Sequence, residues 1–428
     1  MAFVPIIIVF VLYFSGISIA YALFASALFY FSFINTGSPV DLLLQRFITS
    51  TQSFPFLAIP FFIMAGCIMN YAGISKRLMN FADVITGHLP GGLAQVNVLL
   101  SMLMGGVSGS ANADAAMQCK MLVPEMEKRG YSKGFSVAIT AASSAATPVI
   151  PPGIDLIVYA LIAKVSVTKI FMAGYVPGIL MAICLMVAVH IISKKRHYLP
   201  SREKRATLRE ILYQTKESIW ALLFPFGIII ALRIGMITPS EAGAVAVLYC
   251  LLVGVLAYKD LKWEHIPKIL KETVEGTSTV VLIIVAANIF GYYMTWEQIP
   301  QLITEAMLQI TDNKYLMLLL INVLFLVIGM FLEGGAAIII MVPILLPLVT
   351  QLGVNPVHFG LICIVNIMIG GITPPFGSMM FTTCSISGCK LNEFIKETIP
   401  FIIALLVALF IVTYWEGLIL FVPNLLAP

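Results

Sequence analysis

Four short motifs hold most of the side chains that could bind a ligand. Two are rich in glycine, GGVSGSANAD at 105–114 and GMFLEGG at 329–335, and two break an apolar run with proline, TPVIPPG at 147–153 and GGITPPFG at 370–377. Hydroxyl and carbonyl oxygens suit a hard monovalent cation, and the N-terminus of a helix suits an anion. The motifs therefore indicate sites for a small cation and for an anion.

The candidate ligands are short polar side chains on both sides of each break. A helix cap, or a hydroxyl bonded to its own helix, explains any single serine or threonine equally well. An N-terminal cap likewise explains Asp114, and a first-turn acid explains Asp155. The candidates are Ser108, Ser110, Asn112, Asp114, Ser143, Ser144, Thr147 and Asp155 in one half of the chain, and Glu333, Asn366, Thr373, Ser378, Thr382 and Thr383 in the other.

The composition places these motifs in a membrane. The chain has 428 residues, of which 60% are hydrophobic and 11% charged, with a mean hydropathy of +1.00. Soluble chains carry about 25% charged residues, and this chain repeats the runs of roughly 20 apolar residues that a span needs. The sequence therefore predicts an all-α polytopic membrane protein. Acids at membrane depth are costly and usually functional, which favours roles for Asp114 and Asp155.

Several classes of protein are excluded. The net charge of +4 does not indicate nucleic-acid binding, because Lys and Arg lie between apolar runs, where orientation signals occur. The seven cysteines lack a CxxC spacing and the five histidines lack a ligand spacing, so we expect neither disulfides nor a transition metal. No GxxxxGKS or GxxxxGKT motif is present, which excludes an ATPase. An intramembrane enzyme would need a base, and no histidine lies near the breaks.

The chain contains one unit twice. At an offset of 223 residues, glycines and prolines recur in step across more than 70 residues. We therefore divide the chain into a first repeat, 1–205, and a second repeat, 206–428. The matching pairs include Gly106 with Gly329, Pro124 with Pro347, Pro151 with Pro374, and Pro177 with Pro400.

The sequence of each repeat predicts a re-entrant hairpin, a broken helix and further membrane spans. The hairpins, 92–128 and 314–350, are too long for one helix, and the broken helices are 132–163 and 356–388. Five crossings lie between the hairpins, and because five is odd the repeats are inverted, with about ten crossings in all. The other apolar runs are 2–14, 16–34, 53–71 and 167–192 in the first repeat, and 218–234, 239–258, 277–294 and 397–421 in the second.

Between the spans the sequence predicts amphipathic arms and one structural acid. The arms either brace a scaffold or only anchor the protein at the membrane interface. Glu241 is three residues after Thr238 in TPSE, which matches a capping box and indicates a structural role. The arms are 38–50, 72–90, 202–217 and 262–275.

The basic residues orient the chain. Nineteen of the 25 Lys and Arg residues lie in segments assigned to one face, which is cytoplasmic by the positive-inside rule. The first hairpin then opens from the cytoplasm and the second from outside. With ten crossings, both termini lie outside.

Together the motifs resemble the large membrane subunit of TRAP transporters. GGVSGSANADAAM with VPEMEKRGY, TPVIPPG, GMITPSEAGAVAV, GGITPPFG and PFLAIPFFIMAG carry the resemblance, which spans nearly the whole chain. It implies a sodium-coupled importer of an organic acid in the bacterial inner membrane, with Na⁺ as the coupling ion. It also implies two partners, a small four-span membrane subunit and a periplasmic substrate-binding protein. Both hairpins and both broken helices would form a transport domain that moves against a scaffold, as in an elevator.

The resemblance further implies two sodium sites with the substrate between them. A carboxylate beside Asp114 is unfavourable without a bound cation or a proton. The implied residues are Ser108, Ser110, Asn112, Thr147, Pro148, Pro151 and Gly153 for the first sodium; Gly329, Glu333, Gly334, Gly370, Thr373 and Pro374 for the second; and Ser110, Asn112, Asp114, Asp155 and Ser378 for the substrate.

The sequence leaves alternatives for the substrate, for the coupling ion and for the class of transporter. The ANAD form of the first tip resembles the sialic acid branch of the family, so we predict sialic acid (N-acetylneuraminate) as the substrate. A C4-dicarboxylate importer is the alternative within the family, and protons could replace sodium. A channel-like facilitator is the alternative from another class, although channels usually build a filter from several subunits rather than two half-sites in one chain.

Overall fold

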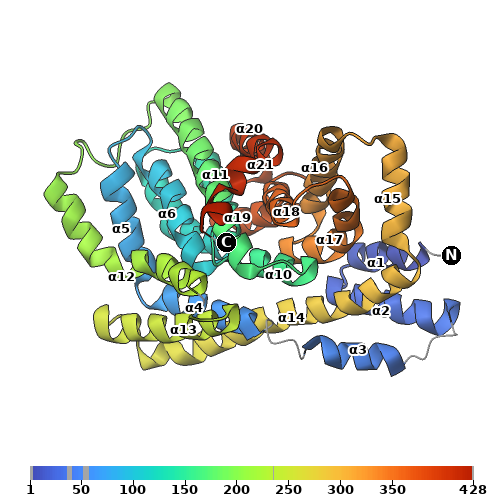
Figure 1. Cartoon of the computed structure of the whole chain (residues 1–428). Coiled ribbons are helices and arrows are strands. Elements are labelled where there is room, and N and C mark those ends of the chain that lie inside the picture. Colours follow the sequence, from blue (N-terminus) through green and yellow to red (C-terminus); the bar gives the residue numbers. More distant parts are fainter. Residues whose placement is uncertain (1–2, 36–40, 52–56, 235, 427–428) are drawn as a thin grey trace.

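The structure is a computed structural model that describes residues 3–35, 41–51, 57–234 and 236–426. Every regular element in these ranges is helical (Figure 1), so the predicted all-α fold class is confirmed. Within them, seven helices are long and apolar enough to cross a membrane, or up to nine if each of two bent helix pairs is one span. Of the four shorter apolar helices, Val4–Phe14, Ile19–Ile34 and Pro356–Gly370 are further candidates for the ten predicted crossings. The fourth, Gly92–Gly106, lies in the first predicted hairpin, and two of the seven long helices, Lys314–Phe331 and Gly334–Gln351, lie in the second.

The helices follow the predicted order of spans, hairpin and broken helix twice over. In the first repeat they are α1 (Val4–Phe14), α2 (Ile19–Phe29), a π-helical turn (Tyr30–Ile34), α3 (Asp41–Thr51), α4 (Ala58–Tyr71), α5 (Ile74–Thr86), α6 (Gly92–Ser108), α7 (Ala111–Met121), α8 (Val123–Lys128), α9 (Lys133–Ser144), a 3-10 turn (Thr147–Val149), α10 (Ile154–Ala163) and α11 (Val167–Arg196). In the second they are α12 (Leu208–Arg233), α13 (Pro239–Leu252), a π-helical turn (Val253–Ala257), a 3-10 turn (Trp263–His265), α14 (Ile266–Trp296), α15 (Ile299–Ile310), α16 (Lys314–Phe331), α17 (Gly334–Gln351), α18 (Pro356–Gly370), α19 (Ser378–Ser387), α20 (Leu391–Tyr414), α21 (Glu416–Ile419) and α22 (Phe421–Leu426).

The sequence offset of 223 residues also relates elements of secondary structure. The two π-helical turns, Tyr30–Ile34 and Val253–Ala257, lie at equivalent positions. The hairpin α6–α7 corresponds in the same way to α16–α17, and the broken helix α9–α10 to α18–α19. The internal repeat is therefore present in the structure as well as in the sequence.

Two of the predicted arms are not separate segments. Each of 202–217 and 262–275 was expected to precede an independent span, but the structure has one continuous helix in each place, α12 and α14. Pro225 lies inside α12, and Gly276 lies inside α14 where it packs against the side chain of Ile63. Packing against neighbouring helices overrides the weak local preference of such residues to end a helix.

The other two predicted arms are separate helices. The described part of 38–50 is α3, and residues 38–40 lie outside the described residues. The segment 72–90 contains α5, which is bent by 70° from α4. Gly73 stands between them with a φ of +71°, a left-handed conformation that favours glycine.

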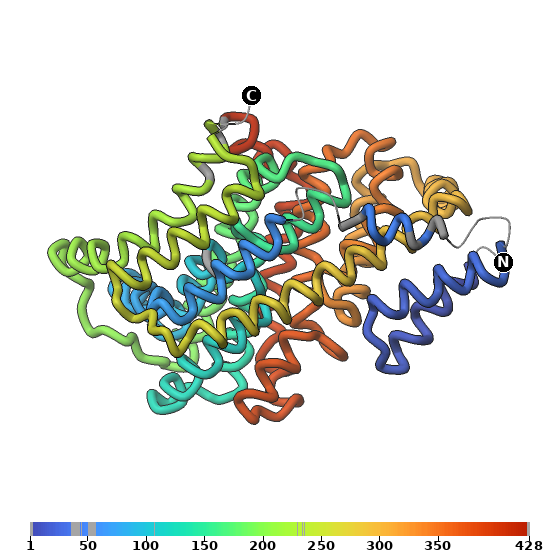
Figure 2. The backbone as a smooth tube through the Cα atoms, turned by 90° about the horizontal axis from the view of Figure 1, so that it is seen from below, coloured from blue at the N-terminus to red at the C-terminus, as the bar shows by residue number. Residues whose placement is uncertain are grey.

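Helix α14 runs along the lower part of the molecule in Figure 1 and crosses much of its width (Figures 1 and 2). It packs against α2, α3 and α4 along its length, so these first-repeat helices share one layer with it. The hairpins and broken helices lie together on its other side in Figure 1. The molecule is therefore divided into a layer around α14 and a body around the two hairpins.

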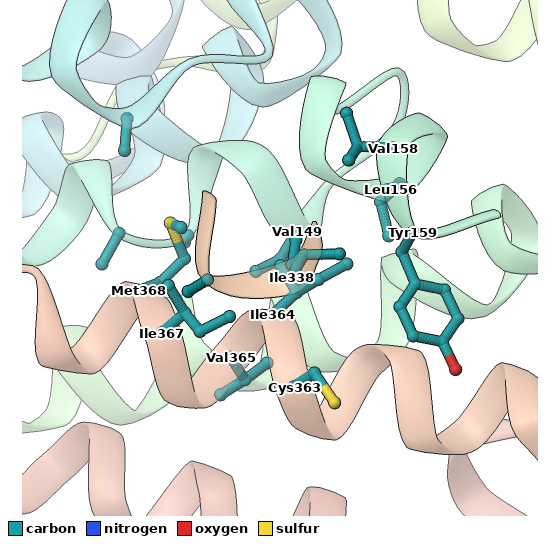
Figure 3. Close-up of a cluster of buried hydrophobic side chains, with 14 of the residues drawn as sticks. Val149, Leu156, Val158, Tyr159, Ile338, Cys363, Ile364, Val365, Ile367 and Met368 are labelled. Atoms are coloured by element: carbon teal, nitrogen blue, oxygen red, sulfur yellow. The ribbon is translucent and has the colours of Figure 1, made fainter. Parts of the chain in front are cut away.

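The core of that body lies where the broken helices of the two repeats cross. Helix α18 is buried at every residue after Pro356, and Figure 3 shows its side chains beside those of α10 and α17. The hydroxyl of Tyr159 donates to the carbonyl of Pro356 (2.6 Å), and its ring covers Gly360, where any side chain would overlap it. The repeats thus share one core and do not pack as two separate units.

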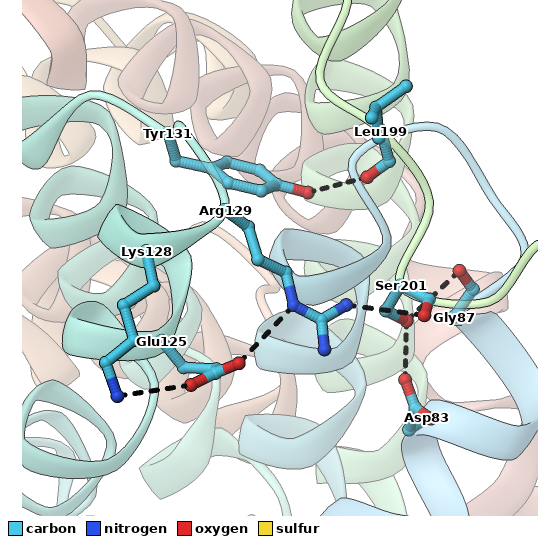
Figure 4. Close-up of polar contacts among 8 residues, drawn as sticks. All are labelled: Asp83, Gly87, Glu125, Lys128, Arg129, Tyr131, Leu199 and Ser201. Carbon is cyan, nitrogen blue, oxygen red and sulfur yellow. Dashed lines mark hydrogen bonds and ion pairs between the residues drawn. The ribbon is translucent and has the colours of Figure 1, made fainter.

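The linker that joins α11 to α12 docks on the base of the first hairpin (Figure 4). The N–H of Ser201 donates to the carbonyl of Gly87 (2.9 Å), and the carbonyl of Ser201 accepts from the Arg129 guanidinium (3.3 Å). The Tyr131 hydroxyl donates to the carbonyl of Leu199 (3.1 Å). Burial raises the pKa of Tyr131 to about 12, so this hydroxyl keeps its proton at neutral pH.

The predicted capping box at the start of α13 is confirmed, and it can be tested. The Thr238 N–H donates to Glu241 Oε2 (2.7 Å), and the Glu241 N–H donates to Thr238 Oγ1 (3.4 Å). We expect Glu241→Ala to lower the free energy of unfolding slightly, because a helix-terminal N–H loses its partner. The measurement is the thermal unfolding midpoint of the purified protein. The control Glu203→Ala removes an exposed acid that forms no ion pair within the described residues, and an equal shift in both variants would contradict the capping role.

Candidate ligand-binding cavity

A cavity of about 560 Å³ lies between the two hairpin tips. The tips contribute Ser108–Ala113 and Leu332–Gly335, and helices α4, α10, α14, α18 and α19 complete the lining. Pockets for small organic ligands commonly measure about 300–1,000 Å³. Both repeats therefore contribute to one cavity that is large enough for an organic metabolite.

The first tip packs against the first proline break. Gly109 follows α6 with a φ of +60°, and a Cβ there would lie 2.7 Å from the carbonyl oxygen of Pro152. The Gly109 carbonyl accepts a hydrogen bond from the N–H of Ile154, the first residue of α10 (3.3 Å). A backbone donor freed by the break is thus satisfied by the tip, as an interrupted helix in a membrane requires.

The second tip packs against the second break in the same way. A Cβ added to Gly370 would lie 2.5 Å from the carbonyl carbon of Gly329, so the two backbones are in direct contact. Thr373 lies in this break, and its hydroxyl donates to the carbonyl of Ile369 (2.7 Å), one turn earlier in the chain. Each tip therefore faces the proline break of its own repeat.

The second helix of each hairpin packs on the broken helix of the other repeat. Helix α7 contacts α19, where the Cys119 thiol donates to the carbonyl of Thr383 (3.4 Å), and α17 contacts α10. Asp155 on α10 faces the start of α17, because a Cβ on Gly334 would lie 3.0 Å from its Oδ2. Ser378, the equivalent of Asp155 by the offset of 223, starts α19. One half of the cavity thus has an acid where the other half has a hydroxyl.

The structure brings part of the predicted site together. The residues that line the cavity are Ser108, Ser110, Asn112, Asp155, Glu333, Gly334 and Ser378. The remaining predicted residues lie in the hairpins, the breaks and the broken helices around it and do not form its lining: Asp114, Ser143, Ser144, Thr147, Pro148, Pro151, Gly153, Gly329, Asn366, Gly370, Thr373, Pro374, Thr382 and Thr383.

Two oxygen atoms at the first tip lack a protein partner. The buried Oγ of Ser108 and Oδ1 of Asn112 form no hydrogen bond within the described residues. Ser110 differs, because its hydroxyl caps α7 by accepting from the N–H of Ala113 (3.5 Å). Buried polar atoms are nearly always paired. The two unpaired oxygens are therefore available to a ligand that needs acceptors or donors at this tip.

Asp114 belongs to a buried hydrogen-bond network beside the cavity. Its carboxylate accepts from the Ser101 hydroxyl (2.8 Å), the Thr147 hydroxyl (3.0 Å) and the Gln118 amide (2.8 Å). It does not cap α7, because these side chains hold it inside the hairpin. Ala337 stands at the equivalent position of the second repeat, so the network exists in the first repeat alone.

The motifs did not predict the residues contributed by the layer around α14. Asn70 on α4 and Glu272 and Glu275 on α14 line the cavity. Glu272 accepts from the Tyr71 hydroxyl (2.6 Å), and Glu275 pairs with Lys271 (3.8 Å). Long-range packing alone brings them to the tips, and no local pattern marks them. Within the network around Asp114, the four-residue spacing to Gln118 was a signal available in the sequence.

The charges of the lining favour cation binding. Four acids line the cavity, and among the described residues no Lys, Arg or His does so. An organic anion in this cavity would be repelled unless a cation entered with it. No group of His, Cys, Asp and Glu in the described part of the chain is arranged to hold a metal ion. The four acids are Asp155, Glu272, Glu275 and Glu333.

Comparison with known proteins decides the family. Residues 6–418 match the family described as "Tripartite ATP-independent periplasmic transporter, DctM component". The chain belongs to this family. It is therefore a large permease subunit of a TRAP secondary transporter and not an enzyme, and the resemblance derived from the motifs is confirmed.

Relatives of this DctM-family chain are named for several substrates. The chain is 36% identical to the sialic acid TRAP transporter large permease protein SiaM of Vibrio cholerae, over 97% of this chain and 96% of that protein. It is 37% identical to the C4-dicarboxylate TRAP transporter large permease protein DctM of Pseudomonas aeruginosa, over 90% and 89%. It is 40% identical to the isethionate TRAP transporter permease protein DctMQ of Oleidesulfovibrio alaskensis over 95% of this chain, but spans 64% of that relative's length. Sequence identity does not separate these substrates.

A solved structure shares the fold. The YdaH transporter of Alcanivorax borkumensis superposes with a TM-score of 0.63, over 88% of this chain and 89% of that chain. The two are 14% identical, so the likeness concerns the fold alone. The polytopic transporter fold of this DctM-family chain is thereby supported by an experimental structure.

The contact between the second tip and its break gives a direct test of the site. We expect Gly370→Ala to destabilise the protein by about 1–3 kcal/mol, because the new Cβ overlaps the backbone of Gly329 in a packed core. The thermal unfolding midpoint and uptake in proteoliposomes should both fall. The control Gly291→Ala places a Cβ on α14 where nothing lies within 4 Å, and it should change neither. An unchanged midpoint for Gly370→Ala would contradict the backbone contact.

Proposed function

We propose that this chain is the large membrane subunit of a sodium-coupled TRAP importer that takes up an organic acid with a periplasmic substrate-binding protein. The observation that carries the proposal is the pair of unpaired buried oxygens, Ser108 Oγ and Asn112 Oδ1, at a hairpin tip in a DctM-family cavity. Oxygen atoms beside a broken helix suit Na⁺. Family membership supports the assignment as a TRAP subunit, and the unpaired oxygens at the first hairpin tip support Na⁺ as the coupling ion.

We assign the first sodium to the first tip and its break. Ser108, Ser110 and Asn112 would supply oxygens, with backbone carbonyls from 147–153. The second sodium would bind between Glu333 and the break at 370–377, where a carboxylate and the backbone of two interrupted helices meet. A proton in place of sodium is the alternative, and Asp114 would then be the candidate carrier.

The organic acid would bind between these cations. Ser110, Asn112, Asp155 and Ser378 line the cavity and remain our candidate substrate residues. Asp114 is held by its own network and would act through Thr147 and the first sodium instead of touching the substrate. The positive N-terminus of α7 and the bound sodium ions would offset the repulsion between the substrate and the acids of the lining.

Sialic acid is the substrate that we propose to test first. The ANAD tip and a relative that is named for sialic acid support it. A C4-dicarboxylate is the second candidate, supported by a relative of similar identity. The cavity of about 560 Å³ accommodates either molecule.

Transport would follow an elevator mechanism. The hairpins and the broken helices share one core, which supports a transport domain that moves as a block, and α4 and α14 line the cavity from the layer that would serve as scaffold. The cavity reaches Glu272 and Glu275 on α14.

Family membership supports our proposal for the partners and the location. A small four-span membrane subunit would complete the scaffold, and the binding protein would deliver the substrate on the outer side. We place the complex in the bacterial inner membrane with both termini outside.

Uptake into proteoliposomes tests the proposal. Liposomes would contain this chain with its small subunit, radiolabelled sialic acid outside, and the binding protein and an inward sodium gradient added separately. We expect uptake only when both are present. Uptake driven by a pH gradient would overturn the sodium assignment, and uptake of succinate but not sialic acid would overturn the substrate. Uptake that needs neither gradient nor binding protein would favour a channel-like facilitator.

A single substitution tests the first sodium site. We expect Asn112→Ala to raise the half-saturating sodium concentration about tenfold, because a bound cation loses one oxygen ligand. Initial uptake rates at increasing sodium concentration measure this change. Asn70→Ala is the matched control, because Asn70 also lines the cavity but on α4, away from the tips. An unchanged sodium dependence in Asn112→Ala would remove this residue from the site.

A further inference from the structure

One face of α12 carries a stripe of exposed side chains that changes from basic to apolar along the helix. The stripe consists of Arg209, Tyr213, Lys216, Trp220 and Leu223, at a spacing of three or four residues. All five are exposed, Tyr213 by 64% and Trp220 by 46%. Farther along the same helix, Phe226 and Ile230 are exposed as well. We call the first five residues the α12 stripe.

The stripe faces away from the protein. Ser218 and Ala221 on the other side of α12 are buried, and the Ser218 hydroxyl donates to the carbonyl of Arg77 on α5 (3.0 Å). Figure 1 shows α12 at the edge of the molecule with α5 beside it. The outward face is therefore available to whatever surrounds the protein in the membrane.

Six of the eight basic residues of this region form no ion pair among the described residues. Residues 193–217 contain eight Lys and Arg against three Asp and Glu. Arg196 pairs with Glu397 (2.8 Å) and Arg202 with Glu210 (3.2 Å). The other basic side chains of the segment form no ion pair within the described part of the chain: Lys194, Lys195, Lys204, Arg205, Arg209 and Lys216. The basic end of the stripe therefore carries unpaired positive charge.

The geometry of a continuous helix sets the depth of each group. Because α12 does not break, Lys216 and Leu223 are about 10 Å apart along its axis at 1.5 Å per residue. That distance separates the phosphate level of a leaflet from its acyl chains, with aromatic side chains at the boundary between them. A capping box between Thr207 and Glu210 fixes where α12 starts and therefore where Arg209 lies.

We propose that the α12 stripe binds an anionic phospholipid of the leaflet on the basic face. Arg209 and Lys216 bind the phosphate of the lipid. Lys204 and Arg205 in the adjoining linker strengthen the positive electrostatic potential around it. An acyl chain lies along Trp220 and Leu223. Unpaired cations in line with lipid-exposed aromatic and aliphatic groups match the charge and polarity of such a lipid. A partner protein helix would leave these cations unpaired unless it supplied acids at the same depth.

Quenching of Trp220 by brominated lipid tests the proposal. The chain has four tryptophans, and replacing the exposed Trp263, Trp296 and Trp415 by Phe leaves Trp220 as the only reporter. The full-length protein is reconstituted with mixtures that contain brominated phosphatidylglycerol or brominated phosphatidylcholine. We expect phosphatidylglycerol to displace phosphatidylcholine at Trp220 with a preference of at least fivefold, about the value of one basic residue at an anionic surface.

Two double variants separate a local site from the general charge of this face. R209Q/K216Q should reduce the preference to near one. The control K262Q/K271Q removes the same charge from the same face, at residues that pair with Glu264 and Glu275, and should retain the preference. Mass spectrometry can also count the lipid that remains bound during purification, in proteins that keep all four tryptophans. The amount of bound phosphatidylglycerol should fall in R209Q/K216Q and should stay unchanged in K262Q/K271Q.

Three results would overturn the proposal. Equal quenching by the two lipids would show that the stripe does not select an anion. An equal loss in both double variants would show that a diffuse field attracts the lipid without a local site. Loss of quenching on addition of the small subunit would show that the stripe is a protein interface.

Discussion

A helix that breaks inside a membrane leaves backbone N–H and C=O groups that lipid cannot satisfy. Here each hairpin tip covers the proline break of its own repeat, through Gly109 against Pro152 and Gly329 against Gly370. The glycines are needed because the contact is between backbones. The cavity lies where these covered breaks meet, so the same constraint that shapes the fold also places free polar groups beside a ligand.

The two repeats satisfy this constraint with different chemistry. The first has the buried network around Asp114, and the second has Ala337 in its place. Across the cavity the difference is reversed, because the acid Asp155 faces the second tip and the hydroxyl of Ser378 lies on the helix that packs against the first hairpin. Pseudo-symmetry provides two similar frameworks, and substitutions within them give two half-sites of unequal charge. A carrier that binds an anion together with cations needs sites of different charge, and these two half-sites provide them.

The long helices connect this site to the rest of the molecule. Helix α14 carries Glu272 and Glu275 to the cavity and continues along α2 and α3. Helix α12 continues from an amphipathic start into an apolar segment without interruption. Because neither helix ends between its amphipathic part and its apolar part, each fixes the spacing of its surface groups along one helix axis.

Patterns along the chain predicted the membrane class, the repeat, the hairpins and breaks, the family, and seven residues of the cavity lining, including Asn112, Asp155 and Ser378. These features depend on composition, periodicity and the local effects of glycine and proline, all of which are local properties of the chain. The folded structure was needed to show that 202–217 and 262–275 belong to continuous helices, that Asp114 lies in a network behind the cavity, and that Glu272 lines it. These features depend on contacts between segments far apart in the chain, and such contacts leave no periodic pattern in the residues that make them.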